Sequence, residues 1–337
     1  MRVGIIGCGR MGRRHMLALK NLGYQIVGAF DSSLASLEST GAEFKLSKDK
    51  LYDNLKEFYS HSNLDAVIIS TNADSHCYYT CISAEYGVKF ILVEKPMATS
   101  LDDCDLMIQV CQSHGAKLGV NHQMQFMEQY IEPKRLLATD AYGGFASMTV
   151  VAGNFGVSMN GSHYFEAFRF MTDEDPYEVT AWFSGGELEN PRGKSYSDRA
   201  GSVRISTRSG KRFYLETGYD QGHGVFVTYC GRYGVLIVNE LTGDLFLSER
   251  EPGYRDLPTS RYGMPAINAK KNIQPVDVVI TSGNVFSALI NSTDNSLAIH
   301  GRLAVEVLVA TYQSVELGSK AIRLGDALDK SKHYPWA

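Results

Sequence analysis

The sequence predicts two domains: an α/β domain with a parallel sheet, then an α+β domain with a large, open-faced, mostly antiparallel sheet. Up to about residue 122, short apolar runs alternate with segments of helical spacing, which is typical of a parallel sheet covered by helices. Beyond that point the runs are β-branched or alternate between apolar and polar residues. Because 337 residues suffice for two hydrophobic cores, we place the domains at residues 1–122 and 123–337.

The elements of the first domain follow one another in a regular β-α order. Gly23 and Gly87 are typical helix ends, and Ser100 is a candidate N-cap for a helix whose first turn carries Asp102 and Asp103. The predicted strands are residues 2–7, 24–31, 64–71, 88–95 and 116–121. The predicted helices are residues 13–23, 73–87 and 99–115.

Polar residues gather where these predicted strands end. The carboxyl ends of parallel strands lie at one edge of the sheet, and ligands bind at that edge. We therefore expect a single site there, with the chemistry carried by the strand-end residues 7–12, 31, 71–72, 94–96 and 121–122.

The turn after the first strand has the spacing G-x-G-x-x-G, formed by Gly7, Gly9 and Gly12, and it opens a helix. Gly7 permits the tight turn, Gly9 lets the backbone approach a pyrophosphate, and Gly12 allows the helix to pack closely on the strand. The helix N-terminus offers N–H groups to the phosphates. Asp31 ends the second strand, 31 − 12 = 19 positions after the last glycine, where a carboxylate binds the ribose hydroxyls. These features predict a Rossmann dinucleotide-binding domain.

The carboxylate of Asp31 also bears on the choice of dinucleotide. It repels a 2′-phosphate, so the sequence favours NAD over NADP. NADP remains open, because several nearby side chains are able to hold a phosphate group, namely Arg10, Arg13, Arg14, Ser32 and Ser33.

The second domain reads as a series of strands joined by short turns. Ser209–Gly210 and Thr242–Gly243 are hairpin-type dipeptides, and residues 295–318 form a long helix that is apolar on most sides. A sheet of this size covered on one face would leave apolar area exposed, so we expect a homodimer or homotetramer formed through the open face. The predicted strands are residues 146–153, 177–185, 201–208, 211–218, 224–230, 233–240 and 243–249.

Composition and charge exclude several other classes of protein. The net charge of −4 and the absence of basic runs give no electrostatic basis for binding nucleic acid or an anionic membrane. No apolar run is long enough to span a bilayer. The six cysteines include no Cys-x-x-Cys pair, and Cys77 and Cys81 lie one helical turn apart, so we expect reduced thiols, no metal site and a cytoplasmic protein.

Four segments together resemble the glucose–fructose oxidoreductase / inositol dehydrogenase (Gfo/Idh/MocA) family. They are "VGIIGCGRMG", "IISTNADSH", "VEKPMA" and "HGRLAVEVLVATYQSVELG", in that order along the chain. The resemblance implies a nicotinamide cofactor, NAD or NADP, and oxidation or reduction of a hydroxyl on a sugar, cyclitol or sugar nucleotide. With the strand-end pattern it predicts these cofactor-binding residues: Gly7, Gly9, Arg10, Met11, Gly12, Asp31, Thr71, Asn72, His76, Glu94 and Lys95. Asn72 also suits a plain helix N-cap, and His76 a solvated first turn.

The family also has an Asp-x-Gly-x-His motif before a helix of its second domain. In "SMNGSHYFEAF", Gly161 and His163 match the motif, but Met159 stands at the aspartate position. The resemblance implies an acid/base role for His163, whose type of side chain titrates near neutral pH. Asn160 is a candidate to orient His163 or the substrate. Tyr164 is a candidate substitute proton donor, with packing as its default role.

Glu94, Lys95 and Pro96 stand at the mouth of a buried strand, where charges are rare unless they are paired or functional. Transfer of a hydride from a carbinol requires a group that handles the hydroxyl proton. Lys95 suits this role and forms the predicted catalytic pair with His163, while Glu94 is expected to pair with Lys95 or to contact the nicotinamide ribose. The Lys95–Pro96 bond is a candidate cis bond. A surface salt bridge is the alternative.

The predicted substrate-binding residues are Lys95, Asn121, Gln123, Asn160 and His163, with ordinary loop hydrogen bonds as the alternative for Asn121, His122 and Gln123. The predicted function is NAD(P)-dependent oxidation or reduction of a carbohydrate-like substrate. Two alternatives remain: an NAD-dependent glycoside-cleaving enzyme of the same family, and a non-catalytic dinucleotide-binding sensor, which Met159 favours.

Overall fold

The computed structural model describes residues 1–337 except for residues 154, 187–189, 191, 259–263, 327 and 337. The chain divides into two compact units, which are described separately. The first unit comprises Met1–Gln123, Asp277–Val305 and Lys330–Ala337, and the second comprises Met124–Val276 and Glu306–Asp329. The predicted division after residue 122 did not anticipate that two later segments return to the first unit.

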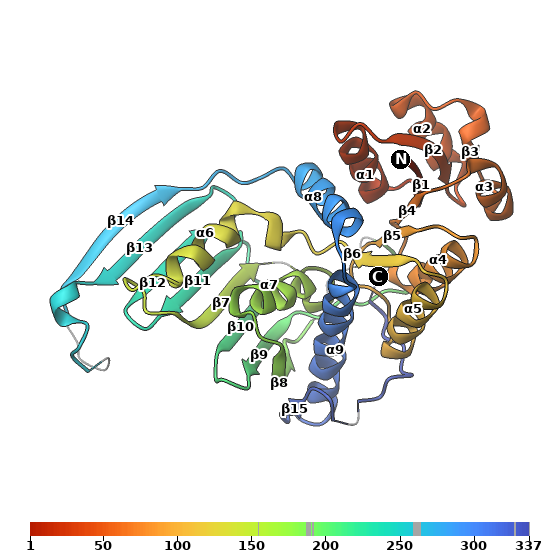
Figure 1. Cartoon of the computed structure of the whole chain (residues 1–337). Helices are drawn as coiled ribbons and strands as arrows, with labels where there is room; N and C mark the ends of the chain where they lie inside the picture. The colour runs from red at the N-terminus through yellow and green to blue at the C-terminus, as the bar shows by residue number, and fades with distance from the viewer. Residues whose placement is uncertain (154, 187–189, 191, 259–263, 327, 337) are drawn as a thin grey trace. The chain divides into compact units, whose positions relative to one another are not determined.

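The first unit contains a parallel sheet of six strands within the described residues, in the order β3-β2-β1-β4-β5-β6 (Figure 1). Its strands are β1 (Arg2–Ile6), β2 (Gln25–Phe30), β3 (Leu51–Tyr52), β4 (Ala66–Ile69), β5 (Phe90–Val93) and β6 (Lys117–Val120). Its helices are α1 (Arg10–Asn21), α2 (Leu34–Phe44), α3 (Leu55–Ser62), α4 (Ala73–Glu85), α5 (Leu101–Ser113) and α8 (Val278–Asn291). The predicted Rossmann domain is confirmed.

Several elements of this unit have no counterpart in the sequence prediction. No element was predicted between residues 31 and 64, where α2, β3 and α3 lie. The strand β3 has only two residues, and α2 is exposed over most of its length, so neither has a strong apolar period. Helix α8 also was not predicted; it packs against α1 and β6. At the N-terminus of α5, Ser100 accepts a hydrogen bond from the Asp103 N–H at 3.2 Å, as predicted for an N-cap.

The second unit contains a sheet of nine strands within the described residues, in the order β14-β13-β12-β11-β7-β10-β9-β8-β15. The predicted, mostly antiparallel sheet is confirmed, with one parallel pair between β7 and β10. Its strands are β7 (Phe145–Gly153), β8 (Pro176–Phe183), β9 (Gly201–Thr207), β10 (Arg212–Gly218), β11 (Phe226–Gly231), β12 (Gly234–Asn239), β13 (Asp244–Arg250), β14 (Ala266–Asn272) and β15 (Ile322–Arg323). Strand β14 was missed because all seven of its residues are exposed and show no apolar alternation.

One face of this sheet forms the core of the second unit, and the other face is partly apolar and accessible. Cross-strand partners form a continuous buried row from β13 to β8, consisting of Leu245, Val238, Val227, Val150, Leu215, Val203 and Ala181. Helices α6 (Glu128–Leu137) and α7 (Ser162–Thr172) lie against β11 and β7 (Figure 1). Residues next to this row along each strand lie on the other face of the sheet, where Tyr214 on β10 is 36% exposed and Phe226 on β11 is 41% exposed.

The long helix predicted at residues 295–318 is present as α9 (Ser296–Glu316) and contributes residues to both units. In the first unit Gly301 lies so close to β6 that a Cβ there would be 2.2 Å from a Val120 side-chain carbon. In the second unit the Ser314 hydroxyl accepts the Ala181 N–H at 3.0 Å.

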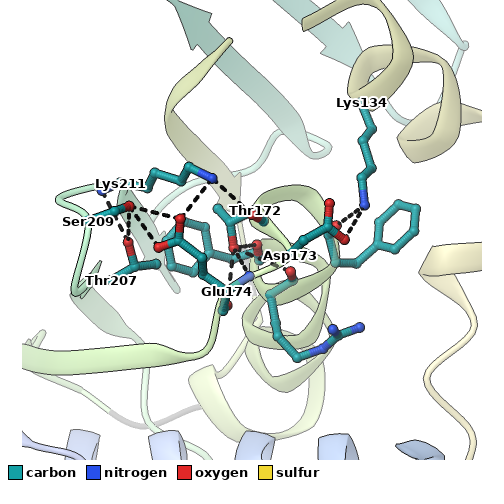
Figure 2. A network of polar contacts seen from close by, with 10 residues as sticks. Lys134, Thr172, Asp173, Glu174, Thr207, Ser209 and Lys211 are labelled. Atoms are coloured by element: carbon teal, nitrogen blue, oxygen red, sulfur yellow. Dashed lines mark hydrogen bonds and ion pairs between the residues drawn. The ribbon is translucent and has the colours of Figure 1, made fainter. Parts of the chain in front are cut away.

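A polar network fixes the end of α7 in the second unit (Figure 2). The Glu174 carboxylate accepts a hydrogen bond from the Ser209 hydroxyl at 2.7 Å and pairs with the Lys211 ammonium at 3.0 Å. The Lys134 ammonium donates to Asp173 at 2.6 Å. These contacts join the end of α7 to α6 and to the β9–β10 turn, which has Gly210 at φ +89° as predicted for a hairpin.

Candidate functional site

The three glycines of the turn between β1 and α1 differ in what surrounds their Cβ positions. Gly7 has φ +92°, and a Cβ there would lie 2.8 Å from the Ser70 backbone. A Cβ on Gly12 would lie 1.9 Å from the Gly7 carbonyl oxygen, so only glycine allows α1 to approach β1 this closely. At Gly9 no described atom lies within 4 Å of the Cβ position. Gly9 therefore faces open space, which is what a backbone approached by a ligand requires.

Asp31 is tied to this turn by the backbone. Its carboxylate accepts the Cys8 N–H at 2.7 Å and the Ser33 N–H at 2.8 Å. Gly9 is the N-cap of α1 and no side chain caps that helix end. A carboxylate has about four acceptor positions, so Asp31 keeps capacity for ribose hydroxyls. Among the arginines that leave NADP open, Arg13 is already paired with Glu43 at 3.1 Å.

His76 is buried rather than solvated, so the surface alternative for this residue is wrong. Its ring lies between two strand-end loops, with Nε2 3.1 Å from the Thr71 carbonyl oxygen and Nδ1 3.0 Å from that of Pro96. Burial lowers the pKa of His76, so the neutral ring donates to one of the two carbonyls near pH 7. His76 thus connects the loop after β4 to the loop after β5. The Thr71 hydroxyl accepts a hydrogen bond from Ser75 at 2.8 Å.

Glu94, at the end of β5, is the centre of a buried polar cluster. Its Oε1 lies 2.7 Å from His15 Nε2 and accepts the Asn121 side-chain N–H at 2.8 Å, while its Oε2 accepts the Lys95 backbone N–H at 3.2 Å. Burial alone would raise the pKa of Glu94, but His15, the charge of Lys95 and Asn121 outweigh it and lower the pKa to about 2. Glu94 is therefore a buried carboxylate near neutral pH.

Asn121 and Gln123, predicted to bind substrate, both have partners within the first unit. The Asn121 amide lies 3.4 Å from the Ser282 hydroxyl, in addition to its bond to Glu94. The side-chain oxygen Oε1 of Gln123 accepts hydrogen bonds from the Thr281 hydroxyl at 3.2 Å and the Ser282 hydroxyl at 3.1 Å. The observed contacts favour the alternative role, in which these side chains connect the end of β6 to α8.

The sequence prediction did not include His15, although it is a member of this cluster and only 1% exposed. A signal was present, because His15 follows Gly12 by three positions and so lies on the same side of α1 as Gly12, Met16 and Leu19, which are buried. Two buried atoms of this cluster, His15 Nδ1 and Asn121 Oδ1, have no hydrogen-bond partner among the described residues. The contact between His15 and Glu94 joins helix α1 to the end of β5.

Lys95 is half-buried and lies two positions after Val93, the last residue of β5. The Lys95–Pro96 peptide bond is cis, which confirms the sequence prediction. The predicted site residues of the first unit follow the carboxyl ends of strands in one parallel sheet. They are the glycine turn, Asp31, the loop at Thr71–Asn72, Glu94 and Lys95. The structure therefore brings the predicted residues of the first unit to the same edge of that sheet.

In the second unit, the motif residues surround the start of α7. Met159 and Asn160 belong to a π-helical turn (Val157–Gly161) that leads into α7, where His163 is half-buried. The carboxylate of Asp198, which the sequence prediction did not include, accepts the N–H groups of Ser158 at 2.7 Å and Met159 at 2.9 Å. Asp198 therefore places a carboxylate on the turn that precedes His163.

Tyr164 is buried, its hydroxyl donates to Glu240 at 2.7 Å, and its ring stacks on Phe155. Burial raises the pKa of Tyr164 well above 10. These contacts support packing, the default role, over proton donation.

The fold and the strand-end residues define a dinucleotide-binding α/β unit combined with a second, sheet-based unit. Comparison with known proteins relates the first part of the chain to a family. Residues 1–122 match the family model GFO_IDH_MocA, described as "Oxidoreductase family, NAD-binding Rossmann fold".

Curated relatives are similar to this chain, and those named here at 31% identity are matched over little more than a third of their length. An inositol 2-dehydrogenase/D-chiro-inositol 3-dehydrogenase from Halalkalibacterium halodurans is 31% identical over 132 residues, which cover 39% of this chain and 36% of the relative. The alignment with a D-apiose dehydrogenase from Paraburkholderia graminis, 31% identical over 140 residues, covers 41% of this chain and likewise spans 36% of that protein. An inositol 2-dehydrogenase from Saccharopolyspora erythraea is 24% identical over 95% of both chains.

Solved structures share the whole fold at low sequence identity. An oxidoreductase from Agrobacterium radiobacter, in complex with NAD+, L-tartaric acid and magnesium, has a TM-score of 0.78 at 17% identity over 96% of this chain and 98% of its own. The WlbA dehydrogenase of Bordetella pertussis, in complex with NADH and UDP-GlcNAcA, has a TM-score of 0.73 at 19% identity over 97% of this chain and 99% of its own.

Among the residues that the structure describes, no helix is long and apolar enough to cross a membrane.

Proposed function

We propose that the protein is an NAD(P)-dependent oxidoreductase that transfers a hydride between nicotinamide and a hydroxyl or keto carbon of a sugar, cyclitol or sugar nucleotide. The observation that supports this most is the arrangement at one edge of the parallel sheet. There a glycine turn that is open at Gly9 lies at the end of β1, and a lysine beside a buried carboxylate lies at the end of β5.

The residues present fit a bound dinucleotide. The uncapped N-terminus of α1 and the open side of Gly9 would hold the pyrophosphate, and Asp31 would hold the adenosine ribose, which favours NAD. Further cofactor contacts are proposed for Arg10, Met11, Thr71 and Asn72, which are all accessible to solvent in part. When bound, the nicotinamide supplies the hydride acceptor or donor.

Lys95 is proposed to handle the proton of the reacting oxygen. Its ammonium group can donate to an oxygen that gains negative charge as a carbonyl is reduced. The carboxylate of Glu94 attracts the Lys95 ammonium, and this attraction is one cause of the low pKa of Glu94. Because Glu94 is fixed by His15 and Asn121, its charge stays in one place beside Lys95.

The second unit is proposed to supply His163 as an acid/base group and Asn160 as a substrate contact. The support is the partial motif match at Gly161 and His163, the half-exposed position of His163 and the exposed position of Asn160. The substrate class rests on the named relatives, which act on inositols and on D-apiose. We also propose a homodimer or homotetramer that forms through the open face of the nine-stranded sheet.

A panel of sugars, cyclitols and sugar nucleotides, each assayed with NAD and with NADP for a net change in reduced-nicotinamide absorbance, tests this proposal. With an active substrate, Lys95→Met should abolish turnover while NAD still binds. The matched control is Lys89→Met, which changes an exposed lysine just before β5 and should leave turnover unchanged. Near-normal turnover in Lys95→Met would refute the assignment of Lys95.

A second candidate is a dinucleotide-binding sensor that does not catalyse a reaction, which the methionine at position 159 favours. Tight NAD binding without turnover of any substrate in the panel would support the sensor and contradict the oxidoreductase.

A further inference from the structure

A segment near the end of the chain lies across the loop that follows Lys95. This segment, Lys330–Trp336, is called the strap below, and it belongs to the first unit (Figure 1). Trp336 is completely buried, its indole Nε1–H donates to the Ala98 carbonyl at 3.0 Å, and the Tyr334 N–H donates to the Thr99 carbonyl at 3.0 Å. The two aromatic rings of the strap are stacked, with centroids 4.7 Å apart.

The other end of the strap is attached to the start of α5. The Lys330 carbonyl accepts the Asp102 N–H at 3.0 Å, and the Lys330 ammonium lies 3.3 Å from the Asp105 carboxylate. His333 Nδ1 lies 3.1 Å from the Thr99 hydroxyl. The strap therefore holds both the loop after β5 and the first turn of the helix into which that loop runs.

The loop is also held from its other side. His76 Nδ1 on α4 lies 3.0 Å from the Pro96 carbonyl oxygen, and the strap donates to the carbonyls at positions 98 and 99. Met97 and Ala98 are completely buried, so water has no access with which to replace a missing donor at Ala98. Lys95 is joined directly to this immobilised stretch of backbone.

We propose that the strap is a positioning element for Lys95, with the Trp336 indole N–H as the group that fixes the loop. The inference rests on the proposed function of Lys95 and extends it to a segment more than 230 positions away in the sequence. A buried carbonyl that loses its donor is left unsatisfied, and the loop relieves this by shifting. A shift of about 1 Å at a reacting group costs about 10²-fold in rate.

The experiment distinguishes the effect of the indole N–H donor from the effect of the volume that the aromatic ring fills. Trp336→Phe keeps an aromatic ring in the buried position but removes the donor. The matched control is Trp182→Phe, which changes the only other tryptophan of the chain, half-exposed on β8. Each variant is compared with the wild-type protein by amide hydrogen exchange of residues 97–100, by the rate of reductive methylation of Lys95 with Lys89 as internal reference, and by kcat and KM.

Trp336→Phe should speed amide exchange of residues 97–100 by about tenfold, which corresponds to the ~1.4 kcal/mol scale of one lost hydrogen bond. It should also change the methylation rate of Lys95 relative to Lys89 and lower kcat by about 10–100-fold, with KM for NAD nearly unchanged. Trp182→Phe should alter none of these. A loss of thermal stability in Trp336→Phe without a change at residues 97–100 or at Lys95 would show a purely structural role and overturn the proposal.

The exchange and methylation measurements need no substrate. If the wild-type protein turns over no substrate, the proposed function fails, while these two measurements still decide whether the strap positions Lys95. If turnover is present but Trp336→Phe has wild-type kcat and an unchanged Lys95, the strap proposal alone fails.

Discussion

Replacing Glu94 by glutamine should destabilise the first unit strongly at neutral pH and much less in acid. In the folded protein the pKa of Glu94 is about 2, compared with an ordinary value of 4.5. The difference between the two pKa values corresponds to about 3 kcal/mol of stabilisation of the folded state, which is fully present at pH values above the pKa of Glu94 in the unfolded chain. Because the folded pKa is the lower one, the unfolded state binds protons first as the pH falls. By pH 3 about 2 kcal/mol of the stabilisation is lost.

The expected loss of unfolding free energy in Glu94→Gln is therefore about 3 kcal/mol at pH 7 and about 1 kcal/mol at pH 3. Urea unfolding followed by tryptophan fluorescence measures it, with both proteins carrying Trp182→Phe so that the buried Trp336 reports on the first unit alone. A loss of the same size at both pH values, or a loss well below about 1 kcal/mol at pH 7, would refute the assignment of Glu94 as a buried, ionised carboxylate.

Three further predictions concern other parts of the chain. Hydrogen bonds, that from Thr207 first, lower the pKa of Glu174 to about 2 as well, but this side chain is 31% exposed. Glu174→Gln should therefore lower the free energy of unfolding by less than about 1 kcal/mol at pH 7, and this loss should shrink with added salt. A salt-independent loss would contradict the prediction. Gly12→Ala should lower the Tm, because the new Cβ would lie 1.9 Å from the Gly7 carbonyl oxygen. Gly9→Ala should leave the Tm unchanged and weaken NAD binding measured by calorimetry. Equal losses of Tm in the two variants would contradict a packing role for Gly12 and a ligand-facing role for Gly9. Phe226→Lys, at a 41% exposed position on the open sheet face, should dissociate the proposed oligomer in sedimentation, and a monomeric wild-type protein at micromolar concentration would remove the basis for that oligomer.

Much of the first unit could be predicted because its signals are local. The strands β1, β2, β4, β5 and β6 are short apolar runs. In the turn, Gly7 has a conformational reason and Gly12 a steric one, which their spacing already indicates. Prediction failed where the signal was weak, as in the two-residue strand β3 and the fully exposed strand β14. Within the described residues of the nine-stranded sheet, β7 and β10 form the one parallel pair, which was also not predicted, because strand patterns do not state which neighbour a strand will take.

The candidate site shows the same division. The sequence by itself determined that charged and polar residues would follow the strands of a parallel sheet, since this depends only on the order of apolar runs and turns. Only the tertiary structure decided which partners they have: His15 meets Glu94 across 79 positions, and Trp336 meets Ala98 across 238. Such pairs have no local pattern, because chain packing alone brings them within hydrogen-bonding distance.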